Sequence, residues 1–177
     1  MDNKDIEKIM NQIYPGLTHY VRDVDLDKKH INNYKVGNII YEKAFVDTTC
    51  KIGKLNKTTR YSIFSNQAVE LNTIADKKYQ NNWGLCLIDR NSAFKILDIY
   101  EYNNKTLITL LHIPLELSEL LRNVSTNLDD QIINTARSRF EKSFNDKTFI
   151  ELDDEWYTRL KFPLGMSDEG ILFNKPE

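Results

Sequence analysis

Residues 91–113 read NSAFKILDIYEYNNKTLITLLHI, and this stretch decides the fold. Apolar, aromatic and β-branched side chains fill residues 94–102 and 106–113. Such runs are typical of β-strands. A short polar turn, Asn103-Asn104, separates the two runs. We therefore predict an antiparallel hairpin that turns at these two asparagines.

An upstream stretch, residues 34–49, reads YKVGNIIYEKAFVDTT and also has a strand-turn-strand character. Turn chemistry at residues 36–38 precedes an apolar run from Ile39 to Val46. We expect this run to form one largely buried strand, in the same sheet system as the hairpin.

The rest of the pattern predicts an α+β protein with an antiparallel or mixed β core and C-terminal helices. We expect one domain over residues 1–177, with an α+β core at 1–113 and a helical, aromatic appendage at 114–177. The aromatic content of the last 29 residues predicts that they pack back on the body. Further strands are expected at residues 17–22, 61–66 and 83–88. Helices are expected at 6–13, 115–124 and 128–144, the last of them capped at Thr126 or Asn127. Residues 67–82 are expected to be mixed helix and loop.

The composition of the chain limits the kinds of partner that it can bind. The chain has 177 residues, 41% of them hydrophobic, which is enough for one sizeable core. A net charge of -2 provides no surplus of cations for a phosphate backbone, so nucleic acid is disfavoured as a partner. The sequence contains no apolar run of signal-peptide or membrane-spanning length. We therefore expect no membrane contact and a cytoplasmic location.

The cysteines, histidines and lysines match no familiar site motif. Cys50 and Cys86 lack metal-ligand spacing, and the three histidines lie far apart in the sequence. We predict reduced structural thiols and no metal. Residues 51–58, KIGKLNKT, lack the upstream Gly and the Ser or Thr directly after Gly53-Lys54 that a phosphate-binding loop requires.

The order and wording of residues 34–49 and 91–113 resemble the central and final sheets of the arginine-serine-glutamate class of mono-ADP-ribosyltransferases. This is the toxin fold that uses NAD. The resemblance covers roughly residues 17–113. It implies NAD as the cofactor and a protein as the target or partner.

In that family an Arg on the first core strand holds the NAD phosphate, because a guanidinium offers paired donors to an anion. Arg22 occupies this place, although Asp23 follows it where the family usually has Gly. Read without the family, Arg22 could form a surface ion pair with Asp23, Asp25 or Asp27.

The family's Ser-Thr-Ser, which supports the NAD site with hydroxyl groups, aligns with Asp47-Thr48-Thr49. Thr48 matches, whereas Asp47 replaces the first Ser. The resemblance therefore assigns NAD binding to Arg22, Thr48 and Thr49. Hydroxyl groups at a strand end are also ordinary turn chemistry.

The family's catalytic Glu-x-Glu is missing. Its place, just upstream of the strand at 94–102, reads Trp83-Gly84-Leu85. Preorganised charge of this kind is commonly worth about two to three orders of magnitude in rate. We assign no catalytic residue and predict that Trp83 packs into the sheet. Asp76 and Asp89 are nearby acids, and we expect Asp89 to shape the turn in which it lies.

Two functions remain open on the sequence. The first is an ADP-ribosyltransferase-like protein that binds NAD, with weak or absent catalysis. The second is a non-enzymatic protein-binding module, such as an immunity, antitoxin or phage-host interaction protein.

Overall fold

A computed structural model gives the fold and describes Lys4 and residues 15–71, 83–146 and 154–176. Within these residues one mixed sheet has the strand order β2-β7-β8-β4-β1-β3-β6-β5. Neighbouring strands are antiparallel except β4 and β8, which are parallel. The predicted α+β class with a mixed core is confirmed. The strands are β1 (Thr18–Val24), β2 (Ile39–Glu42), β3 (Val46–Thr49), β4 (Thr59–Ser65), β5 (Val69–Glu70), β6 (Leu85–Ile88), β7 (Ser92–Tyr102) and β8 (Lys105–Ile113).

The hairpin prediction is confirmed. Strands β7 and β8 pair from Tyr102↔Lys105 to Ala93↔Ile113. Asn103 and Asn104 have φ of 50° and 59°, the left-handed conformation that two-residue hairpin turns require.

Strand β2 pairs with β7, as expected, but the prediction of one strand from Ile39 to Val46 is wrong. The chain turns after Glu42, whose Oε1 accepts a hydrogen bond from the Ala44 amide at 2.9 Å. This local side-chain bond competes with strand pairing and separates β2 from β3.

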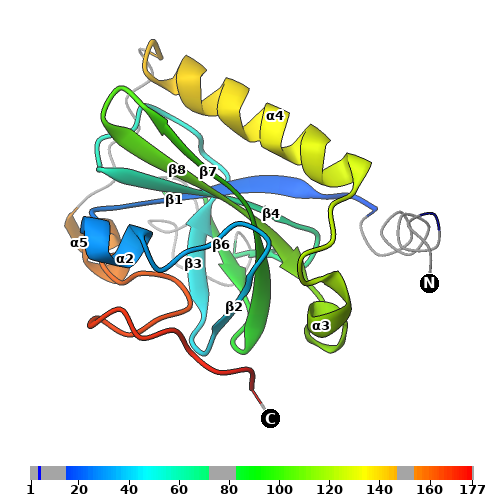
Figure 1. Ribbon diagram of the computed structural model, residues 1–177. Helices are drawn as coiled ribbons and strands as arrows, with labels where there is room; N and C mark the ends of the chain where they lie inside the picture. Colours follow the sequence, from blue (N-terminus) through cyan, green and yellow to red (C-terminus); the bar gives the residue numbers. More distant parts are fainter. Residues whose placement is uncertain (1–3, 5–14, 72–82, 147–153, 177) are drawn as a thin grey trace.

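The sheet bends between β1 and β3. Strand β1 pairs with β4 along its whole length, from Thr18↔Ser65 to Val24↔Thr59, but with β3 only at Val21↔Thr49. Figure 1 shows β3 running steeply across the direction of β1. Strands β3, β6 and β5 therefore form a separate wing, and the candidate site lies where this wing meets β1.

Helix α4 (Asn127–Ser143) lies along one face of the long strands, as Figure 1 shows. Its start has a capping box between Thr126 and Asp129, which confirms the predicted cap. The predicted helix at 115–124 is shorter, with a 3₁₀ turn, η2 (Leu115–Leu117), before α3 (Ser118–Leu121).

The remaining described helices are α2 (Lys28–Ile31) and α5 (Asp154–Arg159). The predicted helix at 6–13 and most of 67–82 lie outside the described residues. None of the described helices has the length and apolarity needed to cross a bilayer.

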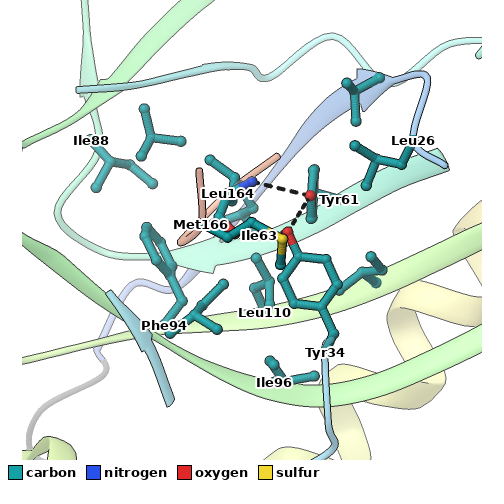
Figure 2. Close-up of a cluster of buried hydrophobic side chains, with 14 residues drawn as sticks. Leu26, Tyr34, Tyr61, Ile63, Ile88, Phe94, Ile96, Leu110, Leu164 and Met166 are labelled. Atoms are coloured by element: carbon teal, nitrogen blue, oxygen red, sulfur yellow. Dashed lines mark hydrogen bonds between the residues drawn. The ribbon is translucent and has the colours of Figure 1, made fainter. Parts of the chain in front are cut away.

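Alternate residues of β8 enter two apolar clusters on opposite faces of the sheet. Leu107 and Leu111 pack beneath α4 with Phe140. Ile108 and Leu110 belong to the second cluster, part of which Figure 2 shows. This second cluster also includes residues of the C-terminal segment, so the last part of the chain contributes to the core.

Candidate functional site

Arg22 lies on β1 with its side chain buried, at 5% residue exposure. One terminal nitrogen of its guanidinium donates to the carbonyl oxygen of Asp47 at 3.2 Å. The other donates to the carbonyl oxygens of Leu160 at 3.3 Å and Phe162 at 3.1 Å. The group that the resemblance assigns to the NAD phosphate is thus bound to backbone carbonyls, two of them from the C-terminal segment.

Among the residues that the structure describes, no carboxylate pairs directly with the positive charge of Arg22. Among the described residues, none of the ion pairs includes Arg22, and its buried Nε has no hydrogen-bond partner. Burial lowers the pKa of Arg22, and electrostatic interaction with Tyr61 and Asp47 acts in the opposite direction. A buried charge is costly unless an opposite charge compensates it. Carbonyl dipoles provide only part of that compensation here.

The acids that follow Arg22 in the chain have other partners. Asp23 accepts two hydrogen bonds from Arg60, both at 2.7 Å, on the opposite face of β1. Asp25 pairs with Lys57 at 3.0 Å. The surface ion pair considered for Arg22 is therefore not formed with Asp23 or Asp25.

Thr48 and Thr49 lie at the end of β3 and are both buried. The Thr48 hydroxyl donates to the carbonyl oxygen of Cys86 at 2.9 Å, and the Thr49 hydroxyl donates to that of Trp83 at 2.6 Å. Both hydroxyls therefore fasten β3 to the chain at β6 in this structure.

The pairing of Val21 with Thr49 places the strand of Arg22 beside that of the two threonines. Because side chains alternate along a strand, Thr48 shares the face of Arg22 and Thr49 lies on the other face. Thr49 there lines a hollow with Lys51 and Lys54. The structure thus brings the three predicted residues to one seam, on two faces of the sheet. Their role in NAD binding stays a prediction.

Residues 160–166, which we call the C-terminal strap, cover Arg22. The Tyr34 hydroxyl donates to the carbonyl oxygen of Leu164 at 2.7 Å. The Leu164 amide donates to the Tyr61 hydroxyl at 3.2 Å, as Figure 2 shows. Burial is the main cause that raises the pKa of Tyr34 well above 10 and that of Tyr61 to about 12. Both phenols therefore keep the proton that this network needs. The Gly165 amide adds a bond to Glu42 Oε2 at 2.9 Å.

The strap is the part of the site that the sequence did not reveal. The aromatic content of the last 29 residues predicted packing on the body, and the contacts of Leu160, Phe162 and Leu164 confirm that packing. Its contact with Arg22 carried no signal, because the residues lie 138 and 140 positions apart and the bonds use backbone atoms.

The expected acid is absent from positions 83 and 85. Trp83 is fully buried and packs against Trp156, with ring centroids 5.3 Å apart, which confirms its predicted packing. Asp89 accepts the Arg90 amide at 2.7 Å and shapes the turn before β7, as expected. Asp76 lies outside the described residues. Glu70, on β5, lies directly opposite Cys86 of β6 and is a carboxylate close to this wing.

No family model and no curated protein matches this chain. Similar solved structures include exoenzyme S from Pseudomonas aeruginosa, in complex with human 14-3-3 protein beta and bound to carba-NAD. It is 15% identical, with a TM-score of 0.48, over 73% of this chain and 64% of that chain. Vis toxin, an ADP-ribosyltransferase from Vibrio splendidus, is 14% identical, with a TM-score of 0.44, over 66% and 57%.

The ADP-ribosyltransferase HopU1 of Pseudomonas syringae is 16% identical, with a TM-score of 0.47, over 55% of this chain and 45% of that chain. The chain spans about half to two thirds of the length of these three structures. Two of them, Vis toxin and HopU1, are ADP-ribosyltransferases, the kind of protein that residues 34–49 and 91–113 resemble. At this level of identity the likeness concerns the fold alone.

Proposed function

We propose that this chain is an ADP-ribosyltransferase-like protein that binds NAD through Arg22 and turns NAD over slowly or not at all. The observation that carries the proposal is the buried Arg22 guanidinium, which has carbonyl oxygens as its acceptors. A phosphate oxygen is a better acceptor for this group than a carbonyl oxygen, because its negative charge compensates the buried positive charge of the guanidinium and its geometry suits paired donors. In this proposal the NAD pyrophosphate replaces the strap on Arg22, and Thr48 and Thr49 support the same edge.

Access to Arg22 then requires the strap to move. Its hydrogen bonds to Tyr34, Tyr61 and Glu42 favour the covered state. A ligand that binds only an open state has its apparent affinity reduced by the fraction of molecules that are open. We therefore expect weak NAD binding that strengthens when the strap is loosened.

Isothermal titration calorimetry with NAD tests the role of Arg22. We expect Arg22→Ala to weaken binding at least tenfold and Arg22→Lys to be intermediate, because Lys lacks the planar pair of donors. Arg122→Ala is the matched control, since Arg122 pairs with Glu119 on the surface, and it should leave binding unchanged. Wild-type protein that binds no NAD at millimolar concentration would refute the proposal.

The covering role of the strap has its own variant. Tyr34→Phe removes the hydrogen bond to Leu164, together with the bond between the Tyr34 and Tyr61 hydroxyls at 2.6 Å. Loss of the bond to Leu164 should weaken strap docking by about 1 kcal/mol, which corresponds to an NAD affinity up to about fivefold higher. Tyr41→Phe is the control, because the Tyr41 hydroxyl donates to Ser118 and Glu119. Equal NAD affinity in the two variants would argue against a strap that competes with NAD.

Slow turnover is expected because Trp83 and Leu85 stand where the family has its acids. Mass spectrometry of NAD and of candidate target proteins should show little conversion by the wild type. Robust conversion would contradict this expectation, and the loss of that conversion in Glu70→Gln or Asp89→Asn would identify the acid. A chain that neither binds nor converts NAD is better described by the second function, a protein-binding module.

A further inference from the structure

Three metal-ligating side chains meet on the wing, and none of them is a hydrogen-bond acceptor of Arg22. Cys50 directly follows β3, Cys86 lies on β6, and Glu70 ends β5. The strand order β3-β6-β5 places Cys86 between the other two. One ligand atom from each residue, two thiol sulfurs and a carboxylate oxygen, lies within 4.8 Å of the others.

We propose that Cys50, Glu70 and Cys86 bind a divalent metal ion of the zinc type. Thiolate ligands select soft or borderline ions such as Zn²⁺, and a carboxylate is an accepted further ligand. At a Zn–S distance of about 2.3 Å, tetrahedral geometry places two sulfurs about 3.8 Å apart. An ion therefore requires a contraction of about 1 Å or less from the spacing observed. Three protein ligands leave a fourth position for water.

The strand register favours a metal ion over a disulfide bond. Thr48 is the Cα partner of Cys86, so Cys50 lies two residues further along and faces Cys86 diagonally. Diagonal positions in an antiparallel pair are about 7–8 Å apart. A disulfide bond usually needs Cα atoms about 4.4–6.8 Å apart. A shared ion can bridge this larger separation.

The backbone at Gly84 makes room for the cluster. The sulfurs of Cys50 and Cys86 lie 3.6 Å and 3.5 Å from the Gly84 carbonyl oxygen. A Cβ atom at position 84 would lie 3.2 Å from the Cys50 sulfur and 2.9 Å from a Lys51 side-chain carbon, and Gly84 has a φ of +56°. Glycine at this position thus allows the thiol of Cys50 to approach.

The site is open to solvent on one side, because Cys50 and Glu70 are exposed and Cys86 is buried. An ion can therefore reach it without unfolding of the wing. The sequence predicted no metal because the ligands come from three strands, and no spacing between Cys50 and Cys86 signals a site.

Titration of the reduced full-length protein with Co²⁺ tests the proposal. Thiolate coordination produces sulfur-to-cobalt charge-transfer absorption, and we expect one equivalent to bind and Zn²⁺ to displace it. Cys50→Ser, at an exposed position, should reduce this absorption and lower Zn²⁺ affinity at least tenfold. Glu70→Gln should lower the affinity with less change in the charge-transfer band, and Glu101→Gln, at an exposed strand position, should change neither.

Zn²⁺ should also raise the melting temperature of the wild type and not that of Cys50→Ser, since a ligand that binds the folded state stabilises it. Wild-type protein without charge-transfer absorption, or with absorption that Cys50→Ser leaves intact, overturns the proposal. Air oxidation that joins the two cysteines in a disulfide bond would lower the mass of the wild type by two hydrogens. Oxidised protein that still binds no Zn²⁺ after this bond has been reduced also overturns the proposal. None of these measurements depends on NAD.

Discussion

Gly165 allows the strap to dock, so Gly165→Ala should release it. Gly165 has a φ of +73°, and a Cβ atom there would lie 2.7 Å from the Ile40 Cβ. The left-handed conformation costs an L-residue about 1–2 kcal/mol. Forcing an extra carbon into a packed core costs about 1–3 kcal/mol more. The strap should therefore lose about 2–5 kcal/mol of docking free energy.

Gly16→Ala is the matched control for the backbone cost. Gly16 has a φ of +77°, and a Cβ atom there meets nothing within 4 Å. This variant should lose only the conformational part, about 1–2 kcal/mol.

Hydrogen exchange measures the strap directly. The amides at positions 164 and 165 donate to Tyr61 and Glu42, so the docked strap protects them. In Gly165→Ala we expect this protection to fall by the predicted free energy, together with lower stability in urea if the strap unfolds with the core. Protection and urea stability no lower in Gly165→Ala than in Gly16→Ala would refute the reasoning.

Two further predictions concern buried charged and titratable side chains of the sheet. Lys95→Met should lower the free energy of unfolding in urea by about 3–5 kcal/mol, because it leaves the buried Asp129 carboxylate without its cation at 2.6 Å. Lys57→Met, which breaks an exposed ion pair, should lower it by about 1 kcal/mol or less. Equal losses in the two variants would contradict this prediction. Burial lowers the pKa of His19 to about 3 and that of His112 to about 4, against about 6.5 in the unfolded chain. As the pH falls below 6.5, these histidines are protonated in the unfolded chain before they are protonated in the folded protein. Each of them should therefore lower the free energy of unfolding by about 2 kcal/mol between pH 7 and pH 5. His112→Gln should remove about half of this decline in urea unfolding, and an unchanged decline would show that His112 is not its source.

The elements that the sequence predicted well have local causes. Asn103 and Asn104 adopt the backbone conformation of their own turn, and Thr126 caps α4 through a residue three positions away. The error at residues 39–46 also has a local cause, because Glu42 bonds to the amide of Ala44 and ends the strand. An apolar run does not reveal such a bond.

The candidate sites depend instead on how the sheet is ordered. Arg22 is on a predictable strand, yet its acceptors come from the strap through backbone atoms. Cys50 and Cys86 acquire Glu70 as a neighbour only because β6 lies between β3 and β5. Side-chain type and spacing contain no information on either arrangement.

The strap is synthesised after the strands of the sheet, because it lies later in the chain. All the strands that the structure describes end by Ile113, whereas the strap begins at Leu160. At about 5–20 residues per second, a ribosome needs roughly 2–10 s to add the residues between them. During that interval the Arg22 guanidinium has neither of its strap acceptors, the carbonyl oxygens of Leu160 and Phe162. Each newly made chain therefore contains all the described strands of the sheet before it contains the residues that cover Arg22.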